Sequence, residues 1–298
     1  MRHGFVKVAA ATPKIKVADT VYNTEQIRLL MTESAAWGAR ITVFPELCIT
    51  GYTCQDLFLQ EKLIAGAKDA LMQLAEASAS IPGIYFVGLP YEINGKLYNV
   101  AAAISDGQVL GMVPKSWIPN YNEFYEMRHF ASGAELSTDV TLPDGSEVLV
   151  DREQLFVCEQ MNKLKIGVEL CEDLWTPNPP SIAHALAGAD VIVNLSASNE
   201  ITGKSAYRKE LVCGQSARLV SAYIYASAGE GESTQDLVFS GHNLIAENGR
   251  LLAESKRFGY GVIYTEIDVE KLIAERRRMT TFATQDGYVE TSFELEPE

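Results

Sequence analysis

Three side chains with suitable chemistry for cleaving an amide each stand directly after a short apolar run of the sequence. They are Glu46, Lys115 and Cys171. Short apolar runs are typical of buried strands, and ligands bind at the carboxyl ends of the strands in open α/β sheets. The sequence therefore predicts that a carboxylate, an ammonium and a thiol meet in one cleft.

The cysteine would be the nucleophile of such a site. A thiol attacks as the thiolate, and its ordinary pKa of about 8.5 means that a base or a cation must stand nearby. None of the five cysteines lies between the glycines of a nucleophile elbow or in a papain-type motif, and the four histidines lie in no recognisable catalytic signature. An arrangement of cysteine, carboxylate and lysine remains.

Each residue would have its own role in this arrangement. Glu46 would take the thiol proton and later return it to the leaving amine. Lys115 would stabilise the negative oxygen of the tetrahedral intermediate, together with the backbone N–H of Glu172. Taken singly, the three residues have plainer interpretations, because a lone cysteine is usually a small buried side chain and a lone acid or lysine is usually solvated.

The surrounding patterns predict the elements that must position these side chains. An alternating first strand over 1–11, an amphipathic helix over 21–38 and a strand over 41–44 form a βαβ unit. Further helices are predicted over 56–79, 181–187, 205–220 and 269–278, and further strands over 84–89, 98–104, 109–114, 165–170, 191–195 and 223–228. Turn residues indicate antiparallel hairpins among these units, so we expect mixed sheets layered on each other with helices outside.

Composition limits the possible classes of protein. A chain of 298 residues that is 47% hydrophobic can bury one large core. The net charge of −14 argues against nucleic acid or a membrane as a partner. Five scattered cysteines without paired spacing indicate neither a disulfide framework nor a zinc site. The apolar stretch at the amino terminus is too short for a signal peptide or a membrane span, so we expect a cytoplasmic protein.

The segments around the three reactive residues resemble the nitrilase superfamily. These segments are 44–52, 114–126 and 167–175. More narrowly, Pro-Asn-Tyr-x-Glu-Phe-Tyr-Glu over 119–126 and Cys-Glu-Asp-Leu-Trp over 171–175 resemble the glutaminase domains of glutamine-dependent NAD synthetases. The resemblance extends over nearly the whole chain. It implies a nitrilase-like αββα fold of mixed sheets, with Glu46, Lys115 and Cys171 as the catalytic residues.

The same resemblance implies a set of residues that bind the substrate. Glu123 would be a second carboxylate that positions the lysine and the substrate. Four others would surround the α-amino and α-carboxylate groups of glutamine, namely Tyr121, Phe124, Ser198 and Lys204, and Glu172 is the remaining member of the set.

The chain lacks the motif of the synthetase part of those enzymes. No Ser-Gly-Gly-x-Asp-Ser loop for ATP is present, and 198–205 misses a phosphate loop because its first glycine is replaced by serine. We therefore predict a glutamine amidohydrolase domain over 1–280, without a cofactor or metal of its own, and a linker over 281–298. The linker would lead to a synthetase domain outside this chain, for which alone ATP and magnesium are implied, and the resemblance also implies a homo-oligomer.

Two other functions remain open at this level. One is a stand-alone nitrilase-type amidase or carbamoylase, which would have an apolar pocket in place of the charged groups that recognise an amino acid. The other is a non-catalytic subunit that uses the same fold for assembly. Intact Glu46, Lys115 and Cys171 count against the second.

Overall fold

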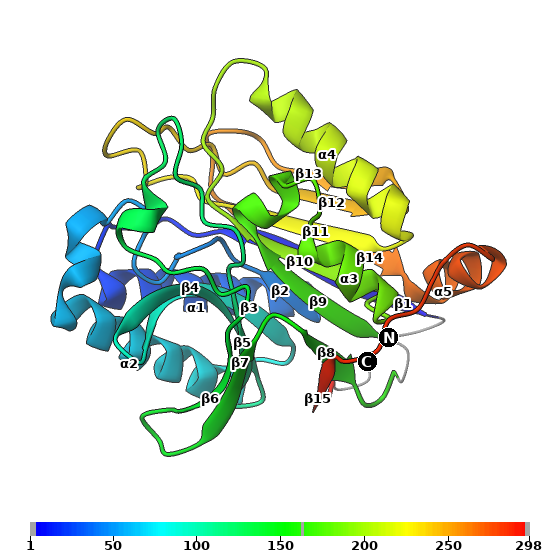
Figure 1. The fold of residues 1–298 in the computed structure, drawn as a ribbon, viewed down its shortest axis with the longest axis horizontal. Helices are drawn as coiled ribbons and strands as arrows, with labels where there is room; N and C mark the ends of the chain where they lie inside the picture. The colour runs from blue at the N-terminus through cyan, green and yellow to red at the C-terminus, as the bar shows by residue number, and fades with distance from the viewer. Residues whose placement is uncertain (1–3, 162–163, 296–298) are drawn as a thin grey trace.

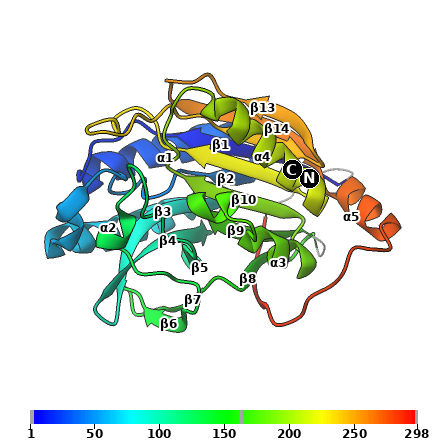
Figure 2. The same cartoon turned by 45° about the horizontal axis from the view of Figure 1, so that its top comes forward.

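Two mixed β-sheets pack face to face in the computed structural model, which describes residues 4–161 and 164–295. The first sheet contains, in spatial order, β14 (Gly261–Asp268), β1 (Phe5–Thr12), β2 (Ile41–Val43), β3 (Ile84–Ile93), β4 (Lys96–Ser105), β5 (Gln108–Pro114), β7 (Glu147–Asp151) and β6 (Ser137–Thr141). The second contains β13 (Arg250–Glu254), β12 (Leu244–Glu247), β11 (Ala222–Ser227), β10 (Val191–Ser196), β9 (Lys165–Leu170), β8 (Gln154–Cys158) and β15 (Val289–Phe293). Figures 1 and 2 show the two sheets with helices on their outer sides.

The helices cover the outer face of each sheet. Helices α1 (Thr20–Ala36) and α2 (Glu61–Ser78) pack on the first sheet, and α3 (Pro180–Leu186) and α4 (Lys204–Leu219) pack on the second. Helix α5 (Val269–Arg278) follows β14 and projects from one end of the sandwich (Figure 1). This layering confirms the predicted αββα fold.

Alternation along the strands separates the central core from the two outer ones. In β10, Val191, Val193 and Leu195 face the first sheet, whereas Ile192 packs among the residues beneath α3 and α4. Successive side chains of a strand point to opposite faces, so Asn194 lies on the same outer face as Ile192. Both faces of the central strands are therefore buried, which explains why their sequences are nearly continuous apolar runs.

Most predicted elements occur at the expected places, with a few differences. The single helix predicted over 56–79 is divided into a 3₁₀ turn, η1 (Gln55–Leu59), and helix α2, because Gln60 between them has an extended backbone with ψ of 125°. Two more 3₁₀ turns, η2 (Glu126–Arg128) and η3 (Cys171–Trp175), follow the strands that carry the reactive residues. Strands β6, β7, β8 and β15 were not expected from the sequence pattern.

The end of the predicted domain needs a correction. Residues 281–298 were expected to form a linker, but Val289–Phe293 within them is strand β15, which pairs in parallel with β8. Phe293 and Leu295 are buried in the core between the sheets. This part of the segment belongs to the fold, because its apolar side chains complete that core. Residues 296–298, like residues 1–3 of the predicted first strand, lie outside the described residues, and a connection to a further domain stays a prediction.

The carboxyl ends of strands from both sheets meet at one edge of the sandwich. Strand β2 runs parallel to β1 and β3, and β10 runs parallel to β9 and β11. The two sheets are joined there by a hydrogen bond of 3.3 Å from the backbone N–H of Glu46 to the carbonyl of Ser196. Within residues 4–161 and 164–295, no helix is both long and apolar enough to cross a membrane.

Candidate active site

Glu46 lies in a tight turn directly after β2 and is fully buried. The next residue, Leu47, has a left-handed backbone with φ of +52°. The turn passes so close to β3 that a Cβ atom on Gly88 would stand 2.3 Å from the backbone nitrogen of Leu47. Only a glycine fits this approach. The turn that points the Glu46 carboxylate inward therefore depends on Gly88, which is 42 positions after Glu46 in the sequence.

Lys115 follows β5 and joins two buried carboxylates. Its ammonium donates to Glu46 Oε1 at 2.5 Å and to Glu126 Oε1 and Oε2 at 2.8 and 2.9 Å. Burial by itself lowers the pKa of the Lys115 ammonium, but the negative charges of Glu126 and Glu46 outweigh burial and hold this pKa well above its ordinary value. We call Glu46, Lys115 and Glu126 the ion-pair cluster, and its lysine stays charged.

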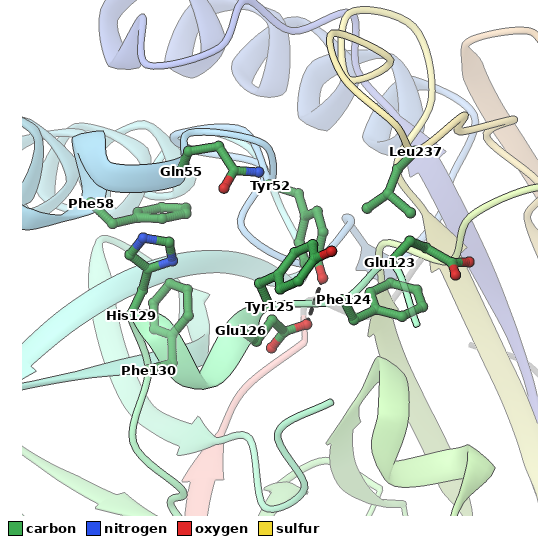
Figure 3. A pocket seen from close by; sticks show the side chains of 10 residues that line it. All are labelled: Tyr52, Gln55, Phe58, Glu123, Phe124, Tyr125, Glu126, His129, Phe130 and Leu237. Atoms are coloured by element: carbon green, nitrogen blue, oxygen red, sulfur yellow. Dashed lines mark hydrogen bonds between the residues drawn. The ribbon is translucent and has the colours of Figure 1, made fainter. Parts of the chain in front are cut away.

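The second carboxylate of this cluster is not the predicted one. Glu123 was expected to position the lysine, whereas in the structure Glu126 makes this contact and Glu123 accepts a hydrogen bond from the side chain of Asn199. The expectation was wrong for the lysine contact because the turn η2 directs the Glu126 side chain inward, where the Tyr52 hydroxyl also donates to it at 2.7 Å (Figure 3). Burial raises the pKa of Glu126, and Lys115 opposes that rise.

Asn99 is a polar residue of the site that sequence reasoning missed. Its side-chain amide donates to Glu46 Oε1 at 2.6 Å, and its backbone carbonyl accepts from the backbone N–H of Lys115 at 2.8 Å. Glu46 Oε1 thus has two donors, while Glu46 Oε2 is buried and has no hydrogen-bond partner among the described residues. That oxygen is free to accept a proton.

Cys171 stands at the end of β9 in a left-handed conformation, with φ of +42°. Residues other than glycine and asparagine rarely adopt this conformation, and it recurs at functional sites. Burial and then the charge of Glu46 raise the pKa of the Cys171 thiol, whereas Lys115 lowers it. The charges of Glu46 and Lys115 thus both act on this thiol, so the structure brings the three predicted catalytic residues together.

Asp173 links the turn at Cys171 to the segment after the lysine. Its buried carboxylate accepts from the backbone N–H of Leu170 at 3.0 Å and of Trp117 at 2.9 Å. Burial raises the pKa of Asp173 to about 7, although both N–H groups favour its charged form. The contact ties the strand end that carries Cys171 to the one that carries Lys115.

Most of the predicted substrate-binding residues form a partly exposed rim, whereas Phe124 and Ser198 are buried. The hydroxyl of Tyr121 donates to Glu172 Oε1 at 2.8 Å. The ammonium of Lys204, at the start of α4, donates to the side chain of Asn199 and lies 5.6 Å from the ring centre of Phe124. Burial lowers the pKa of Lys204. We call Glu123, Asn199 and Lys204 the rim cluster, because Asn199 bonds to both charged side chains.

Ser198 lies at the base of the rim in a buried network. Its hydroxyl accepts from Nε and Nη2 of Arg208, both at 3.2 Å, and Arg208 Nη2 also donates to the carbonyl of Asn199 at 2.9 Å. Arg208 is fully buried and is one turn further along α4 than Lys204. The sequence indicated no role for Arg208, because a single arginine in a helix is usually solvated.

A small pocket lies beside Glu126 of the ion-pair cluster (Figure 3). Tyr52 and Glu126 form part of its lining, together with Glu123, Phe124 and His129, but Lys115 and Cys171 do not. Its open volume of about 30 Å³ has room for water molecules but not for an amino acid. Among the residues that the structure describes, no group of three or more His, Cys, Asp or Glu side chains is arranged to hold a metal ion.

Known proteins resemble this chain over most of its length. The family model described as carbon–nitrogen hydrolase matches residues 7–277. A glutamine-dependent NAD(+) synthetase of Mycobacterium tuberculosis is 42% identical over 94% of this chain. The chain spans 42% of the length of that relative.

Solved structures extend the comparison. A glutamine-dependent NAD(+) synthetase from Cytophaga hutchinsonii, with 29% identity and a TM-score of 0.78, is matched over 88% of this chain and 43% of its own. An amidase from Nesterenkonia, with 18% identity and a TM-score of 0.70, is matched over 94% of this chain and 97% of its own, and shows the likeness of fold.

Proposed function

The chain belongs to the carbon–nitrogen hydrolase family, and from this premise we propose that it hydrolyses the side-chain amide of L-glutamine through a thioester on Cys171. The observation that carries the proposal is the buried ammonium of Lys115, bonded to Glu46 and Glu126, whose charges all act on the Cys171 thiol. Burying one cation with two carboxylates costs desolvation free energy, so such a group in a protein indicates a functional site.

The first half of the reaction forms the thioester. The thiol gives its proton to the free oxygen of Glu46, and the sulfur attacks the amide carbon of glutamine. Lys115, together with the backbone N–H of Glu172, stabilises the negative charge that develops on the amide oxygen. Glu46 then returns the proton to the departing nitrogen, which leaves as ammonia, and the glutamyl group remains on Cys171.

The second half releases glutamate. A water molecule takes the position that ammonia has left, and Glu46 removes its proton as the water attacks the thioester carbon. The tetrahedral intermediate again places its negative oxygen at Lys115. When it collapses, the sulfur leaves and regains a proton from Glu46, so the enzyme returns to its starting state.

Charged groups at the rim support glutamine over a simple amide. Lys204 offers a cation for the α-carboxylate, and its partial burial makes such a pairing stronger than on an open surface. Glu123 and Glu172 offer carboxylates for the α-ammonium, with Tyr121 beside the second. Phe124 and Ser198 complete the set, as an apolar wall and a hydroxyl. An enzyme for plain aliphatic amides has no need of charges of both signs at its mouth.

The partners of the chain are part of the same proposal. We propose that the ammonia serves an NAD synthetase domain of the full-length protein, because relatives are named glutamine-dependent NAD(+) synthetase. ATP and magnesium would belong to that domain alone. A homo-oligomer is proposed from the family resemblance. We also propose a cytoplasmic location, because the five cysteines are free and free cysteines suit a reducing compartment.

A panel of substrates tests the proposed function. Ammonia release would be measured with L-glutamine, an N-carbamoyl amino acid and a simple aliphatic amide. We expect kcat/KM for glutamine to exceed the others by at least about 100-fold, because the others lack one or both charged groups. A preference for either of the others would reject glutamine as the substrate.

Two cysteine variants test the nucleophile. Cys171→Ala should abolish hydrolysis, whereas Cys213→Ala, which removes a half-buried free thiol, should not change it. A glutamine-like electrophile should add its mass at Cys171 alone. Hydrolysis by Cys171→Ala, or labelling spread over several cysteines, would contradict the assignment.

A further inference from the structure

A chain of buried hydrogen bonds on the outer face of the second sheet ends at the backbone of Cys171. The backbone N–H of Cys171 donates to Oδ1 of Asn194 at 3.0 Å, and Nδ2 of Asn194 donates to the hydroxyl oxygen of Tyr223 at 3.0 Å. The Tyr223 hydroxyl in turn donates to Oε1 of Glu169. Asn194 and Tyr223 are fully buried, and Glu169 is 1% exposed.

This relay comes from three adjacent strands and is separate from the substrate side. Glu169 lies on β9, Asn194 is its register partner on β10, and Tyr223 lies on β11. The second oxygen of Glu169 accepts from the backbone N–H of Ser181 in α3 at 2.8 Å. The relay therefore lies between the sheet and its helices, and it reaches the turn at Cys171 from behind.

The direction of every bond in the relay is determined by its first member. A backbone N–H can only donate, so the side-chain oxygen of Asn194 must face Cys171 and its NH₂ group must face Tyr223. The Tyr223 oxygen then accepts, and its own proton must go to Glu169. Glu169 must accept at both oxygens, which only a carboxylate does well. No other orientation of the Asn194 amide satisfies all of these groups.

We propose that Asn194, Tyr223 and Glu169 are positioning residues that hold the Cys171 backbone in its left-handed turn, so that the sulfur faces the substrate. The inference rests on the proposed role of Cys171 as nucleophile. The conformation with φ of +42° is unfavourable for cysteine and persists only where surrounding contacts determine it. The bond from the Cys171 N–H to Asn194 is one such contact, and the rest of the relay keeps the amide in the required orientation.

Tyr223→Phe tests the relay, with Tyr85→Phe as the matched control. Tyr85 is also a buried strand tyrosine, and its hydroxyl donates to the carbonyl of Pro82 at 3.1 Å, in the other sheet. In the full-length protein, the rate of alkylation of Cys171 by iodoacetamide would be followed by mass spectrometry, beside kcat, KM and the melting temperature. We expect Tyr223→Phe to slow alkylation and lower kcat by about tenfold, as loss of one buried hydrogen bond permits, with KM nearly unchanged.

The relay also predicts that its members act as one unit. Glu169→Gln keeps the shape of the side chain but replaces one acceptor oxygen with a donor, so we expect alkylation to slow by about threefold. Combined with Tyr223→Phe, it should slow alkylation by less than the product of the two single effects, because the hydroxyl that is one of the two contacts between Glu169 and Asn194 is already gone. Multiplied effects in the double variant would overturn the relay.

The outcomes separate this inference from the proposed function. If Tyr223→Phe and Tyr85→Phe alkylate Cys171 at the same rate, or if Tyr223→Phe changes only the melting temperature, the relay has no positioning role. If Tyr223→Phe does not fold, Glu169→Gln becomes the test of the relay. Alkylation of Cys171 at the wild-type rate in Glu169→Gln would then overturn the inference. Alkylation needs no glutamine, so a protein that fails to hydrolyse glutamine would reject the proposed function and still allow this test.

Discussion

The ion-pair cluster and the rim cluster contain the same kinds of groups in different surroundings. Lys115 and its two carboxylates are at most 5% exposed, whereas Lys204 and Glu123 are only partly buried. The lysines respond in opposite directions: charges hold the pKa of Lys115 well above its ordinary value, and burial lowers the pKa of Lys204. The difference is that Lys115 has two carboxylates in direct contact, while Lys204 bonds to the neutral side chain of Asn199.

This contrast indicates that the two clusters have different functions. The Lys115 ammonium is paired with carboxylates and shielded from water. Its surroundings therefore need not reorganise when the reaction begins, and its charge can stabilise the transition state. Lys204 has no carboxylate in direct contact among the residues that the structure describes, so it is ready to bind one from outside. We therefore expect kcat to depend on the ion-pair cluster and KM on the rim cluster, and the following variants test that division.

Lys115→Met should have the largest effect. Loss of the cation should lower kcat by about 10²- to 10³-fold, as loss of a donor to the oxyanion does. It also leaves two carboxylates buried without a cation, so the free energy of unfolding should fall by about 3 to 5 kcal/mol. Kinetics and chemical denaturation measure the two effects. A comparable loss of kcat in Lys204→Met would break the comparison.

The stability of Lys115→Met should also depend on pH. Burial already raises the pKa of Glu126, and without the ammonium it rises further. A carboxyl group whose pKa is higher in the folded protein binds protons more tightly there, so stability is lost as pH rises through that pKa. The variant should therefore recover part of its deficit below neutral pH, in denaturation curves compared with those of the wild-type protein.

Glu126→Gln and Glu123→Gln form the next matched pair. Glu126 holds Lys115 through both oxygens, so its replacement should lower kcat by about 10- to 100-fold, as expected for charged hydrogen bonds. Glu123→Gln should change mainly KM for glutamine. The pair distinguishes the observed contact from the one predicted by sequence, and a larger drop in kcat for Glu123→Gln would favour the sequence-based assignment.

Lys204→Met should raise KM for glutamine by about tenfold and leave kcat within about threefold, because a half-buried charge pair contributes to binding and not to the chemical step. Lys204→Arg keeps the charge and should recover most of the affinity, although its fork has a different geometry. If the methionine variant loses kcat at unchanged KM, Lys204 does not act as a substrate anchor.

Arg208→Lys should have the smallest kinetic effect. An ammonium cannot reproduce the fork that reaches Ser198 and the carbonyl of Asn199 together. The rim should loosen, and KM should rise by about threefold, on the order of one weakened hydrogen bond. Arg28→Lys, on the exposed surface of α1, is the control. An unchanged KM in Arg208→Lys would show that the rim does not depend on this buried support.

The local pattern was sufficient to predict the three strand ends that carry Glu46, Lys115 and Cys171. An apolar run followed by a polar residue is written in consecutive positions, so it can be recognised without knowing the fold. The motif over 119–126 also contained Glu126, but it contained Glu123 as well, and linear spacing alone could not choose between them. In the folded chain, the turn η2 directs Glu126 toward Lys115, whereas Glu123 contacts Asn199.

The amino-acid order by itself determined that sheet packs on sheet with helices outside, because this layering follows from periodicity over a few neighbouring residues. It also determined the types of the reactive groups, which are residue identities. Only the tertiary structure decided what supports them. Asn99 meets Glu46 across 53 positions, Tyr223 meets Glu169 across 54, and β15 completes the sheet beside β8. Such contacts arise from the packing of whole strands, since a buried polar group takes whatever partner the fold places within reach.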